Sequence, residues 1–190
     1  MFKILERRGV PPKMLNLIKA LHHEVKAKVK VDGEFTESFQ LGAGLKQGGV
    51  LSVLLWSIYM GAVVEKVHKE FELNGIKGIP IKFNPRSNIF RTNSNLMNRN
   101  SDIKYINEVL FVDDIVEFSP TKSIEQQKLE IWYRVLGRYH QEISIPKTNI
   151  MSTGLGVEVE KEMSIVVNGA EINQLINSSI WAFMKDQITQ

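Results

Sequence analysis

Two adjacent aspartates lie between two short apolar runs in the middle of the chain, Leu110-Phe111-Val112-Asp113-Asp114-Ile115-Val116. Short apolar runs on either side of turn-forming residues are typical of a hairpin of two strands. Two neighbouring carboxylates repel each other, so their burial requires a compensating positive charge. Mg²⁺ would supply that charge, because hard divalent cations bind carboxylate oxygens. On this spacing alone the more common case is a plain exposed turn, since Asp is also a frequent turn residue.

A glycine-rich segment forms the second notable feature, Gly42-Ala43-Gly44-Leu45-Lys46-Gln47-Gly48-Gly49. It precedes an apolar pattern with helical spacing that begins at Val50. Glycines at the start of a helix let its backbone amides approach an anion closely, so Lys46 and Gln47 suit a contact with a phosphate or a base. The spacing matches neither a Walker loop nor a dinucleotide fingerprint. Taken alone, the segment could equally be a loop that only precedes a core helix.

Periodicity predicts the elements around these two segments. We expect one helix from Pro12 to about Val25 and another from Val50 to about Phe71. Alternation of Lys26, Lys28 and Lys30 with apolar residues predicts a half-buried strand with a basic outer face, which turns at Asp32-Gly33. The remaining expected elements are a strand at 79–83, an apolar strand at 106–112, a helix to about Tyr139 capped by Thr121 or Ser123, a strand around Pro146, and a hairpin that turns at Asn168-Gly169.

The segment from Leu73 to Ser101 carries five basic residues and no acidic residue. Its second part is rich in Asn and predicts a long basic loop, and loops of this length are usually functional or disordered. A nucleic-acid contact and a plain solvated loop are both compatible with this composition. The basic residues are Lys77, Lys82, Arg86, Arg91 and Arg99.

Composition excludes several classes of protein. The chain has 190 residues, a net charge of +3 and no cysteine, so it has no disulfide framework, thiol nucleophile or cysteine-ligated metal. Its four histidines show no metal-ligand spacing. The mildly basic balance permits nucleic acid as a partner without requiring it. We expect no signal peptide and no membrane partner, because the longest apolar stretch, Val50 to Val64, is interrupted and shorter than the ~20 residues that span a bilayer.

Four blocks, taken in their order, resemble reverse transcriptases. They are Gly44-Leu45-Lys46-Gln47-Gly48 with Leu51-Ser52, Phe111-Val112-Asp113-Asp114, Lys147-Thr148 with Met151, and Asn168-Gly169 with Ile172. The first three resemble the G-x-x-Q-G-x-x-L-S-P, F/Y-x-D-D and N-x-x-K-T-x-x-M blocks of that family. The fourth is similar to the N-G-x-x-I strand pair typical of the non-LTR (LINE-type) retrotransposon branch. The resemblance covers nearly the whole chain, from about Phe2 to Ile176.

This resemblance implies an α+β fold like a polymerase palm, in which a small antiparallel sheet packs with helices. Residues 1–176 would form a partial reverse transcriptase domain, and 177–190 stay uncertain. The implied activity is RNA-directed DNA polymerisation with Mg²⁺, an RNA template, a DNA primer and deoxynucleotides. Members of the family copy themselves into chromosomal DNA, which implies access to the nucleus. The implied catalytic and metal-binding residues are Asp113 and Asp114, and the implied template- and nucleotide-binding residues are Lys46, Gln47, Gly48 and Lys147.

Departures from the family pattern qualify these expectations. The family uses a third aspartate on an earlier strand, in a block resembling D-x-x-x-A-F-D, and we expect this chain to be N-terminally truncated before that block and to lack the fingers. The chain alone is therefore expected to be inactive, unless Glu108 or Glu117 completes the metal site.

The alternative function is that of a non-catalytic remnant of a decayed element, which binds nucleic acid through Lys26, Lys28, Lys30 and the loop from Arg86 to Arg99. An unrelated two-metal nuclease or cyclase would not explain the glycine block together with Lys147-Thr148. Other substitutions within the blocks are Val50, Val53, Val112, His140 and Ser144.

Overall fold

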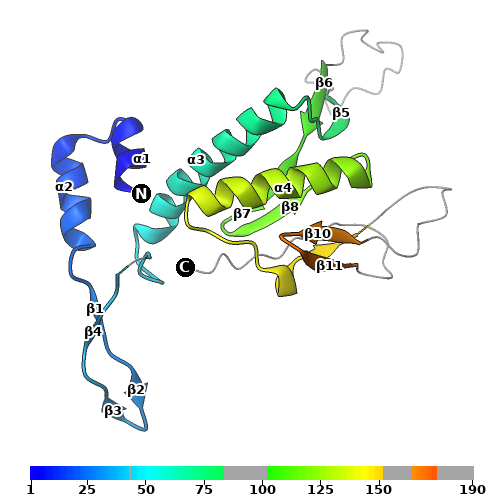
Figure 1. Cartoon of the computed structure of the whole chain (residues 1–190). Coiled ribbons are helices and arrows are strands. Elements are labelled where there is room, and N and C mark those ends of the chain that lie inside the picture. Colours follow the sequence, from blue (N-terminus) through cyan, green and yellow to red (C-terminus); the bar gives the residue numbers. More distant parts are fainter. Residues whose placement is uncertain (43, 84–101, 152–163, 175–190) are drawn as a thin grey trace, which may run out of the picture. The chain divides into compact units, whose positions relative to one another are not determined.

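A computed structural model describes residues 1–42, 44–83, 102–151 and 164–174 (Figure 1). The expectations for Arg86, Arg91, Arg99 and the segment 177–190 lie outside these residues. The chain divides into two compact units, the first comprising Met1–Lys66 and the second beginning at Val67. Helix α3 (Ser52–Leu73) contributes residues to both units.

Two short helices and the beginning of α3 build the core of the first unit. Helix α1 (Phe2–Arg7) precedes α2 (Pro12–Leu21), whose first residue is a proline, as expected for a position that needs no N–H donor. The helix ends at Leu21 rather than near Val25, and Glu24 already has a φ of 52°. One cluster of buried residues in this unit consists of Leu5, Leu15, Ile18 and Leu55.

A narrow hairpin arm follows α2 and comprises residues 26 to 40. Strand β1 (Lys26–Ala27) pairs with β4 (Phe39–Gln40), and β2 (Lys30–Val31) pairs with β3 (Glu34–Phe35), both antiparallel. The predicted turn at Asp32-Gly33 is confirmed, with φ values of 49° and 94°.

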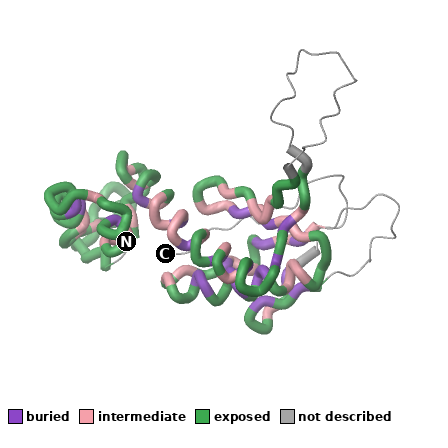
Figure 2. The backbone as a smooth tube through the Cα atoms, turned by 90° about the horizontal axis from the view of Figure 1, so that it is seen from above, coloured by how far each residue is buried: buried purple, intermediate pink, exposed green. Residues whose placement is uncertain are grey.

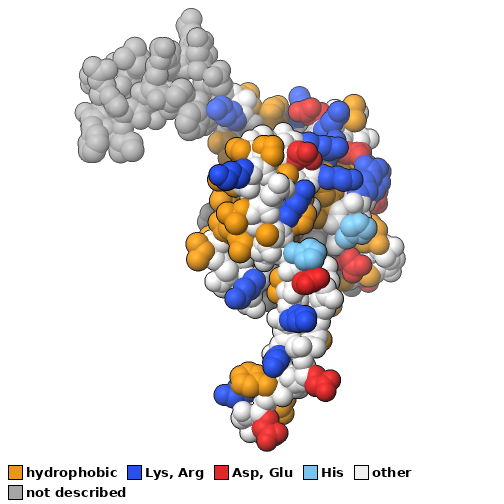
Figure 3. Space-filling view, turned by 90° about the vertical axis from the view of Figure 1, so that its left-hand side faces the viewer, with side chains coloured by type: hydrophobic (Ala, Val, Ile, Leu, Met, Phe, Trp, Pro, Cys, Tyr) orange, Lys and Arg blue, Asp and Glu red, His pale blue; other side chains and the backbone are white. Residues whose placement is uncertain are grey.

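The expected half-buried strand from Lys26 to Val31 is wrong. Between β1 and β2 the ladder is interrupted, because the amide of Val29 donates to the hydroxyl of Thr36 at 3.0 Å instead of to a strand partner. All described positions from Lys28 to Gly42 are exposed, and Val31 keeps 56% of its surface in solvent. The outer face is not uniformly basic either, because lysines, acidic residues and apolar side chains mix along the arm (Figure 3). The exposed acidic residues are Asp32, Glu34 and Glu37.

The described part of the second unit contains four strand pairings, one long helix and the end of α3. Antiparallel pairs are β5 (Ile79–Phe83) with β6 (Asp102–Ile106), β7 (Glu108–Phe111) with β8 (Asp114–Glu117), and β10 (Ile165–Val167) with β11 (Ala170–Gln174). Strand β9 (Asn149–Ile150) joins β11 in parallel. Helices and small, largely antiparallel sheets together confirm the α+β class at a general level.

Helix α4 (Lys122–Arg138) organises this unit (Figure 1). Its predicted N-cap is confirmed, since the hydroxyl of Thr121 accepts a hydrogen bond from the amide of Ile124 at 3.3 Å. The helix packs against β10, where the side-chain amide of Gln126 binds the carbonyl and the N–H of Val166 at 2.6 and 3.0 Å. Most buried apolar residues of the described chain belong to this unit, and they appear as purple segments in Figure 2.

Two strand predictions in the second unit require correction. The single strand expected at 106–112 is interrupted at Asn107. Ile106 is the last residue of β6, and a separate strand, β7, begins at Glu108. The stretch expected to be a strand around Pro146 forms a short 3-10 helix, η1 (Ile145–Lys147), and only its end, at Ile150, lies in a strand, β9. Proline lacks the N–H that a strand ladder requires, and the carbonyl of Ser144 accepts from the amide of Lys147 at 3.0 Å and from the hydroxyl of Thr148 at 2.9 Å. The hairpin at Asn168-Gly169 is confirmed, with φ values of 50° and 77°.

Candidate functional site

The sequence predicts a hairpin that turns at Asp113-Asp114, and the structure has this hairpin with its turn one residue earlier, so that Asp113 lies in the turn and Asp114 is the first residue of β8. Strands β7 and β8 pair Phe111 with Asp114, so Val112 and Asp113 form a two-residue turn. Val112 has a φ of 58°, and a positive φ at the first turn residue is the type II′ pattern that normally requires glycine. A β-branched residue in that conformation is strained, at a cost of about 1–3 kcal/mol. The surrounding hairpin therefore holds Val112, directly before the aspartates, in an unfavourable local conformation.

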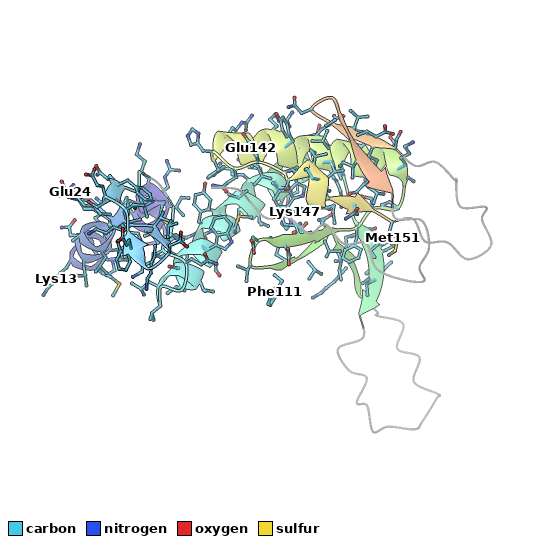
Figure 4. All side chains as sticks on the ribbon, turned by 90° about the horizontal axis from the view of Figure 1, so that it is seen from below. Lys13, Glu24, Phe111, Glu142, Lys147 and Met151 are labelled. Atoms are coloured by element: carbon cyan, nitrogen blue, oxygen red, sulfur yellow. The ribbon has the colours of Figure 1, made fainter. Side chains whose placement is uncertain are left out.

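The two faces of this hairpin differ. Residues directly opposite each other in an antiparallel pair share a face, so Asp114 lies on the same face as Phe111. Phe111 keeps 76% of its surface in solvent, and it is labelled at the end of the hairpin in Figure 4. The opposite face carries the buried Ile115. Asp113 and Asp114 are both partly exposed and therefore open to a cation from solution.

Two carboxylates fit a divalent cation only in part. Mg²⁺ is often held by one or two carboxylates together with water and phosphate oxygens, which Asp113 and Asp114 can satisfy. Within the described ranges, no group of three or more histidine, aspartate or glutamate side chains could hold a metal ion. The pair of metals used in phosphoryl transfer needs ligands on more than one side. This hairpin alone supplies one side of such a site.

Glu108 and Glu117 do not complete the site, although the sequence left that open. They pair with each other at the base of the hairpin, at the end away from the turn. The carboxylate of Glu117 is bound by the ammonium of Lys128 and by the indole N–H of Trp132, each at 2.7 Å. The carboxylate of Glu108 contacts the imidazole of His68. The pKa of Glu117 is raised to about 8, because the effect of burial, which raises it, is larger than the effect of the Lys128 ammonium, which lowers it.

The glycine block forms a tight turn just before α3. The amide of Gly49 donates to the carbonyl of Lys46 at 3.0 Å, which places Gln47 and Gly48 at the centre of the turn. Gly48 has a φ of 75°, a conformation that favours glycine. The hydroxyl of Ser52 donates to the same carbonyl of Lys46 at 2.6 Å and so fixes the turn to the first residue of the helix. Lys46, Gln47 and Gly48 are exposed and can meet a ligand.

The predicted site residues fall into two groups. Asp113, Asp114 and Lys147 belong to the second unit, and Lys147 lies exposed on η1 (Figure 4). Lys46, Gln47 and Gly48 belong to the first unit. The structure thus brings the two aspartates together within one hairpin and gives the glycine block a defined turn.

Sequence reasoning missed the polar network at the base of the hairpin. The signals were present, because Glu117 alternates with Ile115 along β8 and therefore shares its inward face. Lys128 lies four residues before Trp132, so both project from the same face of α4. A lysine on the apolar face of an amphipathic helix indicates a buried partner.

Comparison with known proteins agrees with the resemblance. A family model described as reverse transcriptase (RNA-dependent DNA polymerase) matches residues 1–175, and the chain belongs to this family. No solved structure matches it significantly. The family function is RNA-directed DNA polymerisation, a nucleotidyl transfer with nucleic-acid template and nucleotide substrates, and its members generally use divalent metals. This confirms the predicted function, and the non-catalytic alternative is not favoured. No helix in the described part of the chain is long and apolar enough to cross a membrane.

Proposed function

We propose that this chain is the palm region of a reverse transcriptase from a non-LTR (LINE-type) retrotransposon. The position of Asp113 and Asp114 at the turn end of an antiparallel hairpin is the observation that carries the proposal. The order of the blocks from the Lys46 turn to the hairpin at Asn168-Gly169 supports the branch. The proposed domain covers 1–176, and 177–190 would lie outside it.

Asp113 and Asp114 would hold Mg²⁺ in this proposal. When bound, Mg²⁺ stabilises the attacking and leaving oxygens of the nucleotidyl transfer. The exposed face that Asp114 shares with Phe111 leaves room for a primer end and a nucleotide to approach. Asp113, in the turn itself, is the main metal ligand of the proposal, and Asp114 supports it.

The basic and amide groups would position the substrates. Lys147 is exposed on η1 in the same unit as the aspartates, and its ammonium suits the nucleotide phosphates. Gln47 and Gly48 form an exposed turn whose backbone and amide groups suit a template base and the incoming nucleotide, and Lys46 adds a positive charge beside them. The proposed partners are an RNA template, a DNA primer and deoxynucleotides.

The 190-residue chain by itself is expected to show no detectable primer extension with Mg²⁺. In the described residues the carboxylates available to the metals come from one hairpin, and Glu108 and Glu117 are engaged at its base. Losing one side of a two-metal site removes several kcal/mol of transition-state stabilisation, and each ~1.4 kcal/mol is tenfold in rate. Robust extension by the chain would contradict the expected inactivity and would mean that another carboxylate completes the metal site.

The experiment for the metal site uses Mn²⁺ as a paramagnetic probe. Amide signals of ¹⁵N-labelled protein should broaden first at residues 111–116, and Asp113→Asn should abolish the effect. Asp32→Asn is the matched control, because Asp32 also lies in a two-residue hairpin turn. Equal broadening around Asp32 and Asp113, or broadening unchanged by Asp113→Asn, would show that the proposed site binds no metal specifically.

A further inference from the structure

The base of the hairpin β7–β8 carries two buried acidic residues that face each other. Glu108 and Glu117 are paired across the strands, and their side chains keep only 5% and 1% of their surface in solvent. Each carboxylate meets a basic side chain from a different helix, His68 of α3 and Lys128 of α4. Buried carboxylates are costly in free energy unless they are paired and hydrogen-bonded. These contacts therefore determine the position of the hairpin base against α3 and α4.

The ammonium of Lys128 is completely buried. It donates to the carboxylate of Glu117 and to the backbone carbonyl of Phe118, each at 2.7 Å. Its third side lies over the ring of Phe71, 5.2 Å from the ring centre. An ammonium has three donors, so two of them are used in hydrogen bonds, and the charge is further stabilised by the ring of Phe71.

Trp132 supplies a further hydrogen bond from α4 to β8. Its indole N–H donates to the second carboxylate oxygen of Glu117 at 2.7 Å, so the two oxygens are held by two residues one helical turn apart. Just below, the amide of Phe118 donates to the carbonyl of Asn107 at 2.7 Å and closes the base of the hairpin across both strands. Three directional hydrogen bonds from α4 therefore fix Glu117, the last residue of β8, and Phe118, which follows it.

The distance from this base to the aspartates makes orientation important. Asp114 lies three residues from Glu117 along β8, or ~10 Å at the usual rise of a strand. A tilt of about 10° at the base would move Asp114 by ~2 Å, whereas a functional constellation tolerates displacements of ~0.5 Å.

We infer that Glu117, Lys128 and Trp132 are positioning residues, which set the direction of the hairpin and thereby the geometry of Asp113 and Asp114. This inference rests on the proposed metal site at those aspartates. A buried ion pair is weak evidence for stability, since apolar residues of similar size often replace one without loss. What the directional network adds, and an apolar contact would not, is a fixed angle between β8 and α4.

The test uses two variants of the network and one matched control in the full chain. Trp132→Phe removes a single N–H donor and keeps the ring, and Lys128→Met removes the ammonium and keeps the length of the side chain. Gln126→Ala is the control, because Gln126 comes from the same helix but binds the backbone of Val166 in β10 rather than the hairpin.

Two readouts separate positioning from stability. Residual dipolar couplings of the amides of β7, β8 and α4 report the angle between hairpin and helix without any metal, and Mn²⁺ broadening at residues 111–116 reports metal affinity. For both network variants we expect altered couplings in the hairpin and Mn²⁺ affinity lowered about tenfold, the lower end of the effect of outer-shell partners. In Gln126→Ala both should stay as in the unchanged chain.

The outcomes separate this inference from the proposed function. If Mn²⁺ does not broaden residues 111–116 in the unchanged chain, the proposed metal site fails, while the couplings still decide whether the network sets the hairpin angle. If Trp132→Phe and Gln126→Ala leave couplings and affinity equally unchanged, the network is structural only and the inference is overturned. Should Lys128→Met fail to fold, Trp132→Phe decides alone.

Discussion

The hairpin β2–β3 of the first unit and the hairpin β7–β8 of the second each turn through two residues. The turn of the first has positive φ at both Asp32 and Gly33, the type I′ geometry that a hairpin prefers, and its residues are exposed on both faces. The turn of the second places the β-branched Val112 at a φ of 58°. Its inward face is buried, and its base is bound by two helices.

This difference shows where the chain concentrates its constraints. An exposed arm needs only a favourable turn, and its strands are correspondingly short and interrupted. A hairpin that presents two like charges needs support from elsewhere, because neither the strained turn nor the carboxylates stabilise it. The network of Glu117, Lys128 and Trp132 provides that support at the opposite end from the charges. Strain that the surroundings must maintain is typical of functional sites.

The largest expected effect comes from removing the buried ammonium. Lys128→Met should lower the free energy of unfolding by about 3–5 kcal/mol, because it leaves the carbonyl of Phe118 without its donor and the carboxylate of Glu117 with the Trp132 N–H but without its ammonium partner. Lys30→Met on the arm should change it by less than ~0.5 kcal/mol, since Lys30 is exposed. Urea unfolding followed by circular dichroism measures both. Equal effects would erase the contrast between the two hairpins.

The second prediction concerns the close backbone approach beside the hairpin. A Cβ on Gly78 would lie 1.8 Å from the carbonyl oxygen of Ile106 and 2.8 Å from the Cα of Asn107. Gly78→Ala must therefore displace the backbone at Ile106 and Asn107, directly before β7, and we expect a loss of about 3 kcal/mol in unfolding free energy. Gly42→Ala, after the arm, has open space and should be nearly neutral. A tolerated Gly78→Ala, again by urea unfolding, would mean that the base of the hairpin is not rigid.

The third prediction is a pH dependence of stability. Because burial raises the pKa of Glu117 from 4.5 to about 8, the folded state binds its proton more tightly than the unfolded state. The resulting stabilisation is fully present below pH ~4.5 and is lost as the pH rises through about 8. Burial also raises the pKa of Glu125, which adds in the same direction.

Melting temperatures between pH 5 and pH 8.5 measure this slope. Glu117→Gln should flatten it, because the glutamine does not titrate, whereas Glu34→Gln on the exposed arm should leave it as it is. A slope that is the same in all three proteins would show that Glu117 does not exchange its proton on unfolding.

A structural feature could be predicted from the sequence when the residues that determine it are neighbours in the chain. The turns at Asp32-Gly33 and Asn168-Gly169 and the cap at Thr121 were predictable, because each depends on a few neighbouring residues. The exposure of the arm was not, because alternation describes which residues could face a partner and not whether one is present. The isoleucines around Pro146 suggested a strand, but the local hydrogen bonds to Ser144 form η1 instead.

The candidate site shows the same division. Asp113 and Asp114 were found because they are adjacent in sequence and match a family block. Lys128 was not, because a lysine in a helix usually faces solvent, and its burial follows only from the contact with Glu117, eleven residues away. The arrangement of the glycine-block turn could be anticipated from Gly48, whereas its fixation by the hydroxyl of Ser52 depends on tertiary geometry.

The smallest expected effect is also the most direct test of the strained turn. Val112→Gly should relieve about 1–3 kcal/mol of strain and lose about 0.5–1 kcal/mol to the greater freedom of the unfolded glycine, so we expect a net gain of roughly 1 kcal/mol in unfolding free energy. Gly33→Val, the reverse change in the arm, places a β-branched residue at a φ of 94° and should destabilise by a similar amount. If the strain also orients the aspartates, Val112→Gly should weaken Mn²⁺ binding while it raises stability. A gain in both would mean that the valine serves neither the fold nor the metal site, whereas a loss of stability would show that its contacts outweigh the strain of its backbone.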